Sequence, residues 1–237
     1  MEWLKQIARI ILKDEISESN KIISTFSTQI DGLKKEITNL KYPNPKEQEL
    51  NNKYPTEDLT YLRHETDGDY KIDLRNFINP YDSFIPKVDG KTDEEKAVNG
   101  LKIILDNIKY IDDKSDYGFQ EYWSYSYQTW SRKKGDCEDM SILLHNILLK
   151  SGVPYWKIRL TCGNVDDGKG KVGHCFVTYY YEKENKWVLL DCCYYPNSLP
   201  IELRKDYKEE IFYKETWFSW NQKYCFTKDI KLIEKVN

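Results

Sequence analysis

The chain has 237 residues, a formal net charge of −3 and a sequence pI of about 5.8. Hydrophobic residues make up 40% and charged residues 32%, a balance typical of globular proteins. Lysine and glutamate are mixed along the chain, which excludes the basic stripe expected of a nucleic-acid-binding protein. No apolar run approaches the ~18 residues of a membrane span, so we expect neither nucleic acid nor a membrane as a partner.

The N-terminal segment carries no recognisable export signal. Lys5, Arg9 and Lys13 interrupt its apolar residues, and it lacks a small-residue cleavage site. The default expectation is therefore a cytoplasmic protein. The six cysteines include no C-x-x-C pair, and a chain of this length does not need disulfides, so we expect reduced thiols.

Residues 1–41 have a helical pattern. Isoleucine recurs every seven residues at positions 16, 23, 30 and 37, and Phe26, Leu33 and Leu40 follow the last three of these. This spacing is the a/d seam of a parallel coiled coil. Two interpretations stay open: residues 16–40 form a homo-oligomer or dock on a partner, or the helix packs on its own domain.

Residues 42–91 are rich in Pro, Asn, Asp and Tyr, which predicts an irregular linker and packing segment. A further domain is predicted at 92–237. It opens with a helix whose N-cap is Thr92 and whose N3 residue is Glu95, a capping box. The apolar face of this helix consists of Ala97, Leu101, Ile104 and Ile108. An aromatic, polar loop is predicted at 112–136.

A second helix is predicted from Cys137 to about Lys150, with Gly152 just beyond its end. The period then changes from helical to alternating, which predicts strands. These strands are expected at 155–162, 174–182 and 186–191. The aromatic tail from residue 197 is expected to pack on the same domain.

Cys137 lies at the N-terminus of the second helix, between acidic residues. Asp136 is the predicted N-cap, and Asp139 at N3 can complete a reciprocal capping box. The helix dipole favours a thiolate at Cys137 by at most ~2 kcal/mol, whereas lowering a thiol pKa from about 8.5 to below 5 needs about 5 kcal/mol. Glu138 and Asp139 act in the opposite direction, because like charges raise a thiol pKa. A reactive Cys137 therefore requires a cationic partner, usually a histidine.

The chain offers three histidines. His64 lies in the irregular segment. His145 lies ~12 Å along the helix that begins at Cys137, too far for contact, so we interpret it as structural or surface. His174 opens a predicted strand and follows Gly173, which permits close approach of another backbone or a ligand. His174 is therefore the candidate base.

Asp191 ends the next predicted strand and is the candidate acid that orients the histidine. A hairpin centred between residues 182 and 183 places Asp191 opposite His174. A turn centred on Glu184 and Asn185 instead offsets the pair by about four residues, or ~13 Å. Both registers stay open.

The same part of the chain also allows a zinc site built from Cys137, His174, Cys192 and Cys193. The spacings of these residues match no common zinc module. We therefore expect no metal and no organic cofactor.

Four motifs follow one another in the second domain: QEYWSYSYQTW, KKGDCEDMSILLHNILLKSGV, GHCFVTYYY and KWVLLD. In this order they resemble the transglutaminase-like superfamily, in particular its bacterial cysteine-peptidase-like branch. The likeness lies in the Gly-Asp-Cys-Glu-Asp helix start, the His-opened strand and the Trp…Asp strand, and it extends over about 93–196. One departure is Cys175-Phe176, where many members have Ala then Trp.

The resemblance implies an α+β fold with a papain-like core, in which the nucleophile helix packs on an antiparallel sheet, preceded here by an N-terminal helical extension. By position, Cys137 matches the nucleophile, His174 the base and Asp191 the orienting acid. Trp123 or Gln120 matches the family's side-chain oxyanion donor, which acts beside the Cys137 backbone N–H.

The implied chemistry is acyl transfer on a peptide or protein amide through a thioester. Water as the acceptor gives a cysteine peptidase or amidase, which the peptidase-like branch favours, and an amine gives a transglutaminase. A third interpretation is a non-catalytic assembly protein that retains the fold as a scaffold and oligomerises through its N-terminal helix.

Overall fold

The structure is a computed structural model that describes residues 29–30, 32, 60–65, 68–166 and 168–226. Gln29, Ile30 and Gly32 are helical. The rest of the heptad segment 16–40 lies outside the described residues, so the coiled coil stays a prediction. The chain divides into two compact units, 1–50 and 51–237, and the second carries the elements described below.

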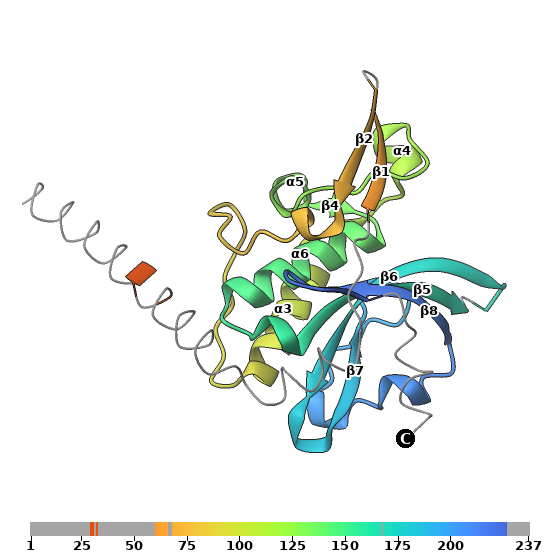
Figure 1. The fold of residues 1–237 in the computed structure, drawn as a ribbon. Coiled ribbons are helices and arrows are strands. Elements are labelled where there is room, and N and C mark those ends of the chain that lie inside the picture. The colour runs from red at the N-terminus through yellow and green to blue at the C-terminus, as the bar shows by residue number, and fades with distance from the viewer. Residues whose placement is uncertain (1–28, 31, 33–59, 66–67, 167, 227–237) are drawn as a thin grey trace, which may run out of the picture. The chain divides into compact units, whose positions relative to one another are not determined.

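A five-stranded antiparallel sheet forms the centre of this unit (Figure 1). Its strand order is β7-β6-β5-β8-β9. The strands are β5 (Ile158–Asp166), β6 (Lys171–Tyr181), β7 (Lys186–Leu190), β8 (Tyr213–Trp220) and β9 (Cys225–Phe226). The three predicted strands correspond to β5, β6 and β7, but β5 ends later and β6 begins earlier than predicted. The aromatic tail joins the same sheet as β8 and β9.

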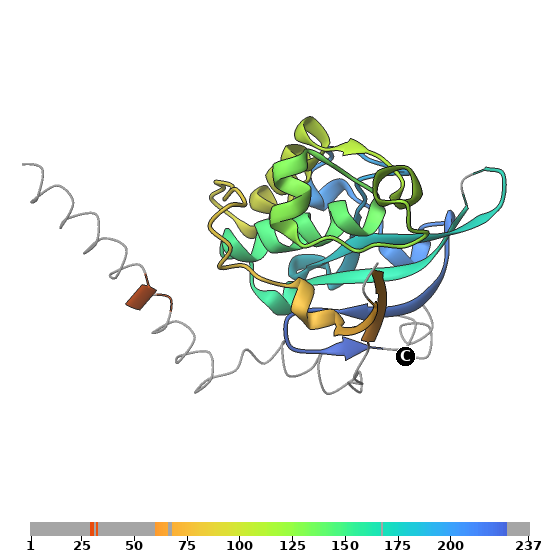
Figure 2. The same ribbon diagram turned by 90° about the horizontal axis from the view of Figure 1, so that it is seen from above.

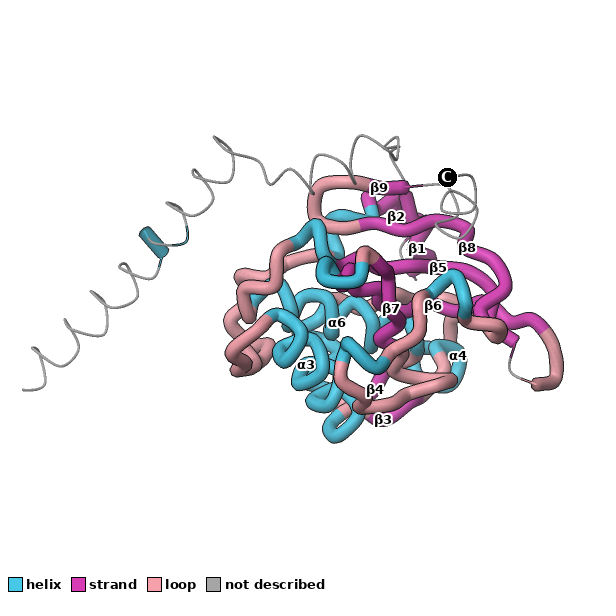
Figure 3. The backbone as a smooth tube through the Cα atoms, turned by 90° about the horizontal axis from the view of Figure 1, so that it is seen from below, coloured by secondary structure: helices cyan, strands magenta, loops and turns pink. Residues whose placement is uncertain are grey.

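Three helices lie on one side of the sheet (Figure 2): α3 (Asp93–Asn107), α5 (Ser126–Arg132) and α6 (Cys137–Lys150). Both α3 and α5 contact α6, which in turn contacts β5 and β6. Figure 3 shows α3 and α6 side by side, next to the strands. The predicted α+β class is confirmed, with the helix of Cys137 packed on an antiparallel sheet. None of the helices that the structure describes is long and apolar enough to cross a membrane.

Helix α6 forms the middle of the core. Its apolar side chains are buried on several sides, because α3 packs on one side and the sheet on another. Gly100 of α3 allows the two helices to approach closely: a Cβ atom there would lie 2.6 Å from Cδ2 of Leu148. The helix ends where predicted, with Gly152 at φ 86° and the N–H of Val153 donating to the carbonyl of Leu148 at 3.0 Å.

The first predicted helix is also confirmed, as is its N-cap: the N–H of Glu95 donates to Oγ1 of Thr92 at 3.2 Å. The loop predicted at 112–136 was wrong in part, because it contains α5 and the short α4 (Asp113–Tyr117). Polar capping begins α4, since Oδ1 of Asp112 accepts from Ser115 N–H at 2.9 Å. Helices this short show no apolar periodicity that the sequence could reveal.

Residues 42–91 are not irregular throughout. They contain a hairpin of β1 (Thr60–Glu65) and β2 (Gly68–Asp73), followed by the 3-10 turn η1 (Leu74–Phe77). The Asp-Gly step whose glycine opens β2 is a hairpin signal that the compositional interpretation overlooked. This segment also contributes buried side chains to the core: Leu74, Phe77, Ile85 and Val88.

The remaining elements are short. A two-residue parallel pair joins β3 (Lys109–Tyr110) to β4 (Lys134–Gly135), just before α6. The other 3-10 turns are η2 (Tyr155–Lys157), η3 (Glu182–Glu184), η4 (Ile201–Leu203) and η5 (Tyr207–Glu209).

Candidate active site

Cys137 is the first residue of α6, as predicted, and its side chain is partly buried. Asp136 occupies the N-cap position, but its side chain makes no capping hydrogen bond. The side chain of Asp139 turns away as well, and its Oδ1 accepts from the N–H of Ser124 at 2.6 Å. The predicted reciprocal capping box is therefore not formed, because Asp139 accepts from Ser124 instead and the Asp136 side chain makes no capping hydrogen bond.

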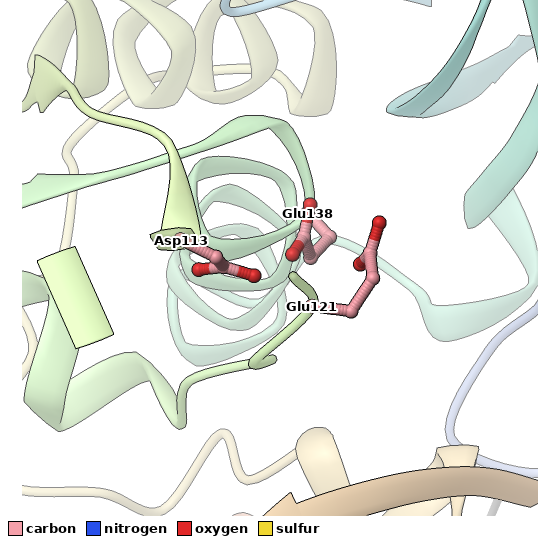
Figure 4. Close-up of side chains that lie close together, drawn as sticks. All are labelled: Asp113, Glu121 and Glu138. Atoms are coloured by element: carbon pink, nitrogen blue, oxygen red, sulfur yellow. The ribbon is translucent and has the colours of Figure 1, made fainter. Parts of the chain in front are cut away.

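These carboxylates belong to a cluster of five acidic residues at the start of α6, which we call the acid cluster. Its members are Asp113, Glu121, Asp136, Glu138 and Asp139. Figure 4 shows three of them, with Asp113 and Glu121 on either side of Glu138. Within each of two groups of three, one oxygen of every carboxylate lies within 4.8 Å of the others. Neither group includes a cysteine or histidine.

The cluster is electrostatically unfavourable when all its members are ionised. Burial, and then repulsion from Asp136, raises the pKa of Asp113 to about 7. Burial likewise raises the pKa of Asp136 to about 6 and that of Glu138 well above its ordinary range. One oxygen of Glu138 and one of Asp136 are buried without a hydrogen-bond partner among the described residues. Unpaired, buried carboxylate oxygens of this kind are suited to a cation.

The acid cluster also affects Cys137 directly. Its thiol donates to Oε2 of Glu138 at 3.2 Å. Burial raises the pKa of Cys137 well above its ordinary value, and the negative charges of Glu138 and Asp136 raise it further. In this state the site favours the neutral thiol, so the structure agrees with the sequence argument that the helix dipole alone does not activate Cys137.

His174 and Asp191 lie in contact and are both buried. Nε2 of His174 is 3.1 Å from Oδ1 of Asp191. The Asp191 carboxylate therefore lies against this ring nitrogen of His174. The other ring nitrogen, Nδ1 of His174, is buried without a hydrogen-bond partner among the described residues.

The hairpin register differs from both predicted alternatives. Val177 pairs with Leu190, which places Asp191 level with Phe176, two residues along from His174. Side chains on one face of a sheet still meet at this diagonal spacing. The contact between His174 and Asp191 forms although the two residues are not directly opposite one another.

Asp191 is held by several donors that the sequence did not reveal. The backbone N–H groups of Cys193 and Tyr195 donate to its two oxygens at 2.7 and 3.3 Å, and the hydroxyl of Tyr213 donates to Oδ2. Burial alone raises the pKa of Asp191, but His174, Tyr213 and the other donors outweigh this and hold the pKa below its usual value. Asp191 is therefore stabilised as a carboxylate.

Contacts along α6 indicate which part of β6 lies near Cys137. Oγ of Ser141 donates to the carbonyl of Cys175 at 3.0 Å, and His145, one turn later, lies close to the backbone of Ile158, which pairs with Tyr179. Helix α6 thus follows β6, and Cys137, one turn before Ser141, lies toward the end of β6 that carries Gly173 and His174.

The imidazole and the helix lie on different sides of this strand. Strand alternation places Cys175 on the α6 side of β6 and His174 on the other. However, the pairing of β7 with β6 begins only at Val177, so β6 has no β7 partner at His174. No hydrogen bond joins Cys137 to His174 in the described part of the chain.

The two candidate oxyanion donors have different surroundings. Trp123 is buried, stacks on Trp220 at a centroid distance of 5.7 Å, and donates from Nε1 to Glu121 at 3.3 Å. Gln120 is exposed on the preceding loop. A further aromatic residue, Tyr194, meets the ring of His174 edge-on at 4.8 Å and was not predicted from the sequence.

The other two histidines lie in different settings. His64 is part of β1, where its backbone pairs with Asp69. His145 is completely buried in α6, and burial lowers its pKa to about 3, so its ring is neutral. His145 therefore lies in the core, which fits the structural alternative rather than the surface one.

Comparisons with known proteins confirm the predicted resemblance. Residues 88–188 match the family described as bacterial transglutaminase-like cysteine proteinase (BTLCP), and the matched segment includes Cys137 and His174. This match supports thiol protease activity and a protein or peptide substrate. Asp191 lies just beyond the end of the matched segment. No curated protein sequence matches the chain.

The chain is also similar to solved structures of LapG from Legionella pneumophila. The EGTA-treated form is 19% identical with a TM-score of 0.47, over 61% of this chain and 76% of LapG. The calcium-bound form is 20% identical with a TM-score of 0.41, over 56% of this chain and 75% of LapG.

Proposed function

We propose that the chain is a cysteine peptidase or amidase in which Cys137, His174 and Asp191 form a catalytic triad. The observation that carries the proposal is the buried contact between Nε2 of His174 and Asp191, at the end of β6 toward which the start of α6 extends. Nδ1 of His174 has no hydrogen-bond partner among the described residues. A buried imidazole held by a carboxylate is the arrangement that a nucleophilic thiol requires. The family match of residues 88–188 supports the same chemistry.

Catalysis begins when the Cys137 thiol leaves Glu138 and turns to Nδ1 of His174, at the edge of β6 that β7 does not cover. Nδ1 takes the thiol proton while Asp191 stabilises the resulting imidazolium. The sulfur attacks the amide carbonyl, and the C–N bond breaks as His174 protonates the leaving amine. Water then attacks the thioester, which releases the carboxylic acid and restores the thiol.

The negative charge that develops on the carbonyl oxygen is stabilised by the first N–H groups of α6. The first N–H groups of a helix have no carbonyl partner within it, so they can donate to the oxyanion. Trp123 is the less suitable side-chain donor, because its indole N–H is occupied by Glu121. Exposed Gln120 has no comparable restriction.

Products distinguish hydrolysis from amine transfer. The chain is incubated with a denatured protein substrate, with and without a primary amine, and the products are identified by mass spectrometry. We expect carboxylate products in both reactions, a folded but inactive Cys137→Ala variant, and an active Cys225→Ala control. Amine adducts in place of carboxylates would support the transglutaminase alternative, and no product of either kind would leave the scaffold interpretation.

The acid cluster fits a divalent cation such as calcium, in place of the sequence-based expectation that no metal binds. Calcium prefers carboxylate oxygens, and the buried, unpartnered oxygens of Glu138 and Asp136 are of this type. Asp113 and Glu121 would join Glu138 as ligands in one group of three, and Asp113 and Asp139 would join Asp136 in the other. A bound cation would supply positive charge that offsets the carboxylates which raise the Cys137 pKa.

Calorimetric titration with calcium chloride tests this part of the proposal. We expect binding and a rise in Tm for the wild type, at least about 10-fold weaker binding for Glu138→Gln, and unchanged binding for the exposed control Asp106→Asn. An absence of both heat and Tm shift would overturn the cation site without affecting the proposed thiol chemistry.

A further inference from the structure

Strand β8 contains a bulge beside the candidate active site. Cys162 of β5 pairs with Phe218, but the next residue, Gly163, pairs with Thr216. Trp217 is therefore the extra residue of the bulge. A bulge redirects the side chain of the extra residue, and bulges occur frequently next to active sites.

The redirected indole lies above Gly173, the residue before His174. A Cβ atom on Gly173 would lie 3.2 Å from Cη2 and 3.8 Å from Cζ3 of Trp217. Between the strands of these two residues lies β5, whose Gly163 pairs with His174 of β6 on one side and with Thr216 of β8 on the other. The six-membered part of the indole thus reaches across β5 to the strand of the candidate base.

Trp217 lies on the same face of the sheet as α6. Gly173 and Cys175 alternate onto one face of β6, and Cys175 is the residue that Ser141 of α6 contacts. Helix α6 begins at Cys137, near this end of the strand, so α6 does not cover the sheet face beyond that residue. Trp217 retains 43% of its surface exposed there, although the neighbouring Trp220 is fully buried.

We propose that Trp217 is a specificity-determining residue, and that its indole binds an apolar side chain of the substrate within two residues of the scissile bond. This inference rests on the proposed function and adds the substrate class. Because Gly173 has no side chain, the Trp217 indole packs over the backbone next to His174, and its half-exposed ring offers an apolar surface there. When an apolar substrate side chain packs on the indole, water is removed from both apolar surfaces, which favours binding.

The alternative is that Trp217 is an ordinary exposed aromatic residue. Phe84 is a matched control, because it is aromatic, 76% exposed and located in the loop before α3. If exposure alone decided the outcome, loss of either ring would have the same effect on reactions at Cys137.

Two alkylating reagents that share one reactive group provide a test that needs no turnover. The rate at which N-phenethyl iodoacetamide modifies Cys137 is divided by the rate for iodoacetamide, and peptide mapping identifies the modified cysteine. We expect this ratio to exceed that of the urea-unfolded protein by about 10-fold in the wild type and in Phe84→Ala. It should fall to the unfolded value in Trp217→Ala and be largely retained in Trp217→Phe.

An equal ratio in the wild type and Trp217→Ala would overturn the inference. The rate with iodoacetamide alone gives a separate result: if Cys137 reacts no faster than buried Cys225, the proposed function fails, whatever the ratio. Cleavage sites in a denatured protein provide the second readout. They should be enriched in apolar residues near the scissile bond for the wild type and should lose that enrichment in Trp217→Ala.

Discussion

At the scale of single residues, the candidate site depends on how Asp191 is held. A carboxylate that orients a catalytic histidine must remain ionised although it is buried. The backbone N–H groups of Cys193 and Tyr195 and the hydroxyl of Tyr213 provide this stabilisation. Tyr213 comes from β8, so a strand outside the matched family segment supports the candidate acid.

The variant Tyr213→Phe tests this support. Loss of the hydroxyl removes a hydrogen bond to a charged group, so we expect the pKa of Asp191 to rise and kcat/KM to fall by about 10-fold. Because the ionised carboxylate is the active form, activity should be lost at higher pH on acidification than in the wild type. The pH profile of kcat/KM measures this shift.

Tyr207→Phe is the matched control, because Tyr207 lies in the same aromatic group but its hydroxyl bonds to Thr216 at 2.6 Å. The acid limb of the kcat/KM pH profile of Tyr207→Phe should coincide with that of the wild type. If Tyr213→Phe behaves like this control, Tyr213 does not support Asp191.

At the scale of elements, the position of α6 on the sheet depends on a few polar contacts within an apolar core. Ser141 is completely buried, and its hydroxyl joins the helix to the carbonyl of Cys175. Ser141→Ala should therefore lower the free energy of unfolding by about 1 kcal/mol, measured by urea denaturation. Ser131→Ala removes an exposed hydroxyl contact of the same length and should change stability by less than about 0.5 kcal/mol. Equal effects would show that Ser141 does not tie the helix to the sheet.

His145 on the same helix predicts a pH dependence of stability. Its folded pKa of about 3 lies below the unfolded value of about 6.5, so the unfolded chain binds the proton more readily. The contribution of neutral His145 to the free energy of unfolding is complete above about pH 6.5 and is lost as the pH falls toward 3. Between pH 6.5 and 5 the loss is about 2 kcal/mol. The acid cluster changes stability with pH in the opposite direction, because its raised pKa values favour folding at lower pH.

Comparison with His145→Leu separates the two effects, because the acid cluster is the same in both proteins. Urea denaturation at pH 6.5 and 5 should show that the wild type loses about 2 kcal/mol relative to the variant. An unchanged difference between the two proteins at the two pH values would contradict the neutral, buried state of His145.

At the scale of the whole molecule, the heptad segment predicts self-association. Light scattering after size exclusion should give a dimer for the full chain and a monomer after removal of residues 1–41. A monomer in both cases would remove the coiled-coil prediction and leave the alternative of a helix that packs on its own domain.

The sequence predicted the parts of the fold that rest on long periodic patterns. Apolar spacing located α3 and α6, and alternation located β5, β6 and β7, because each buries a continuous apolar face. The short helices α4 and α5 and the hairpin of β1 and β2 were missed, since capping and turn residues rather than periodicity define them. In the site, motif order identified the candidate residues, but not the offset register, the acid cluster or Tyr213, all of which depend on contacts between distant segments.

The central claim is that Cys137 is an activated nucleophile, and its reactivity tests this most directly. The folded chain, with and without calcium, is treated with iodoacetamide at about pH 6, and peptide mapping gives the rate at each cysteine. We predict that Cys137 is alkylated faster than Cys162 and Cys225, and that Asp191→Asn reduces this advantage. Alkylation of Cys137 at the same rate as the other two, under both conditions, would contradict the proposed function.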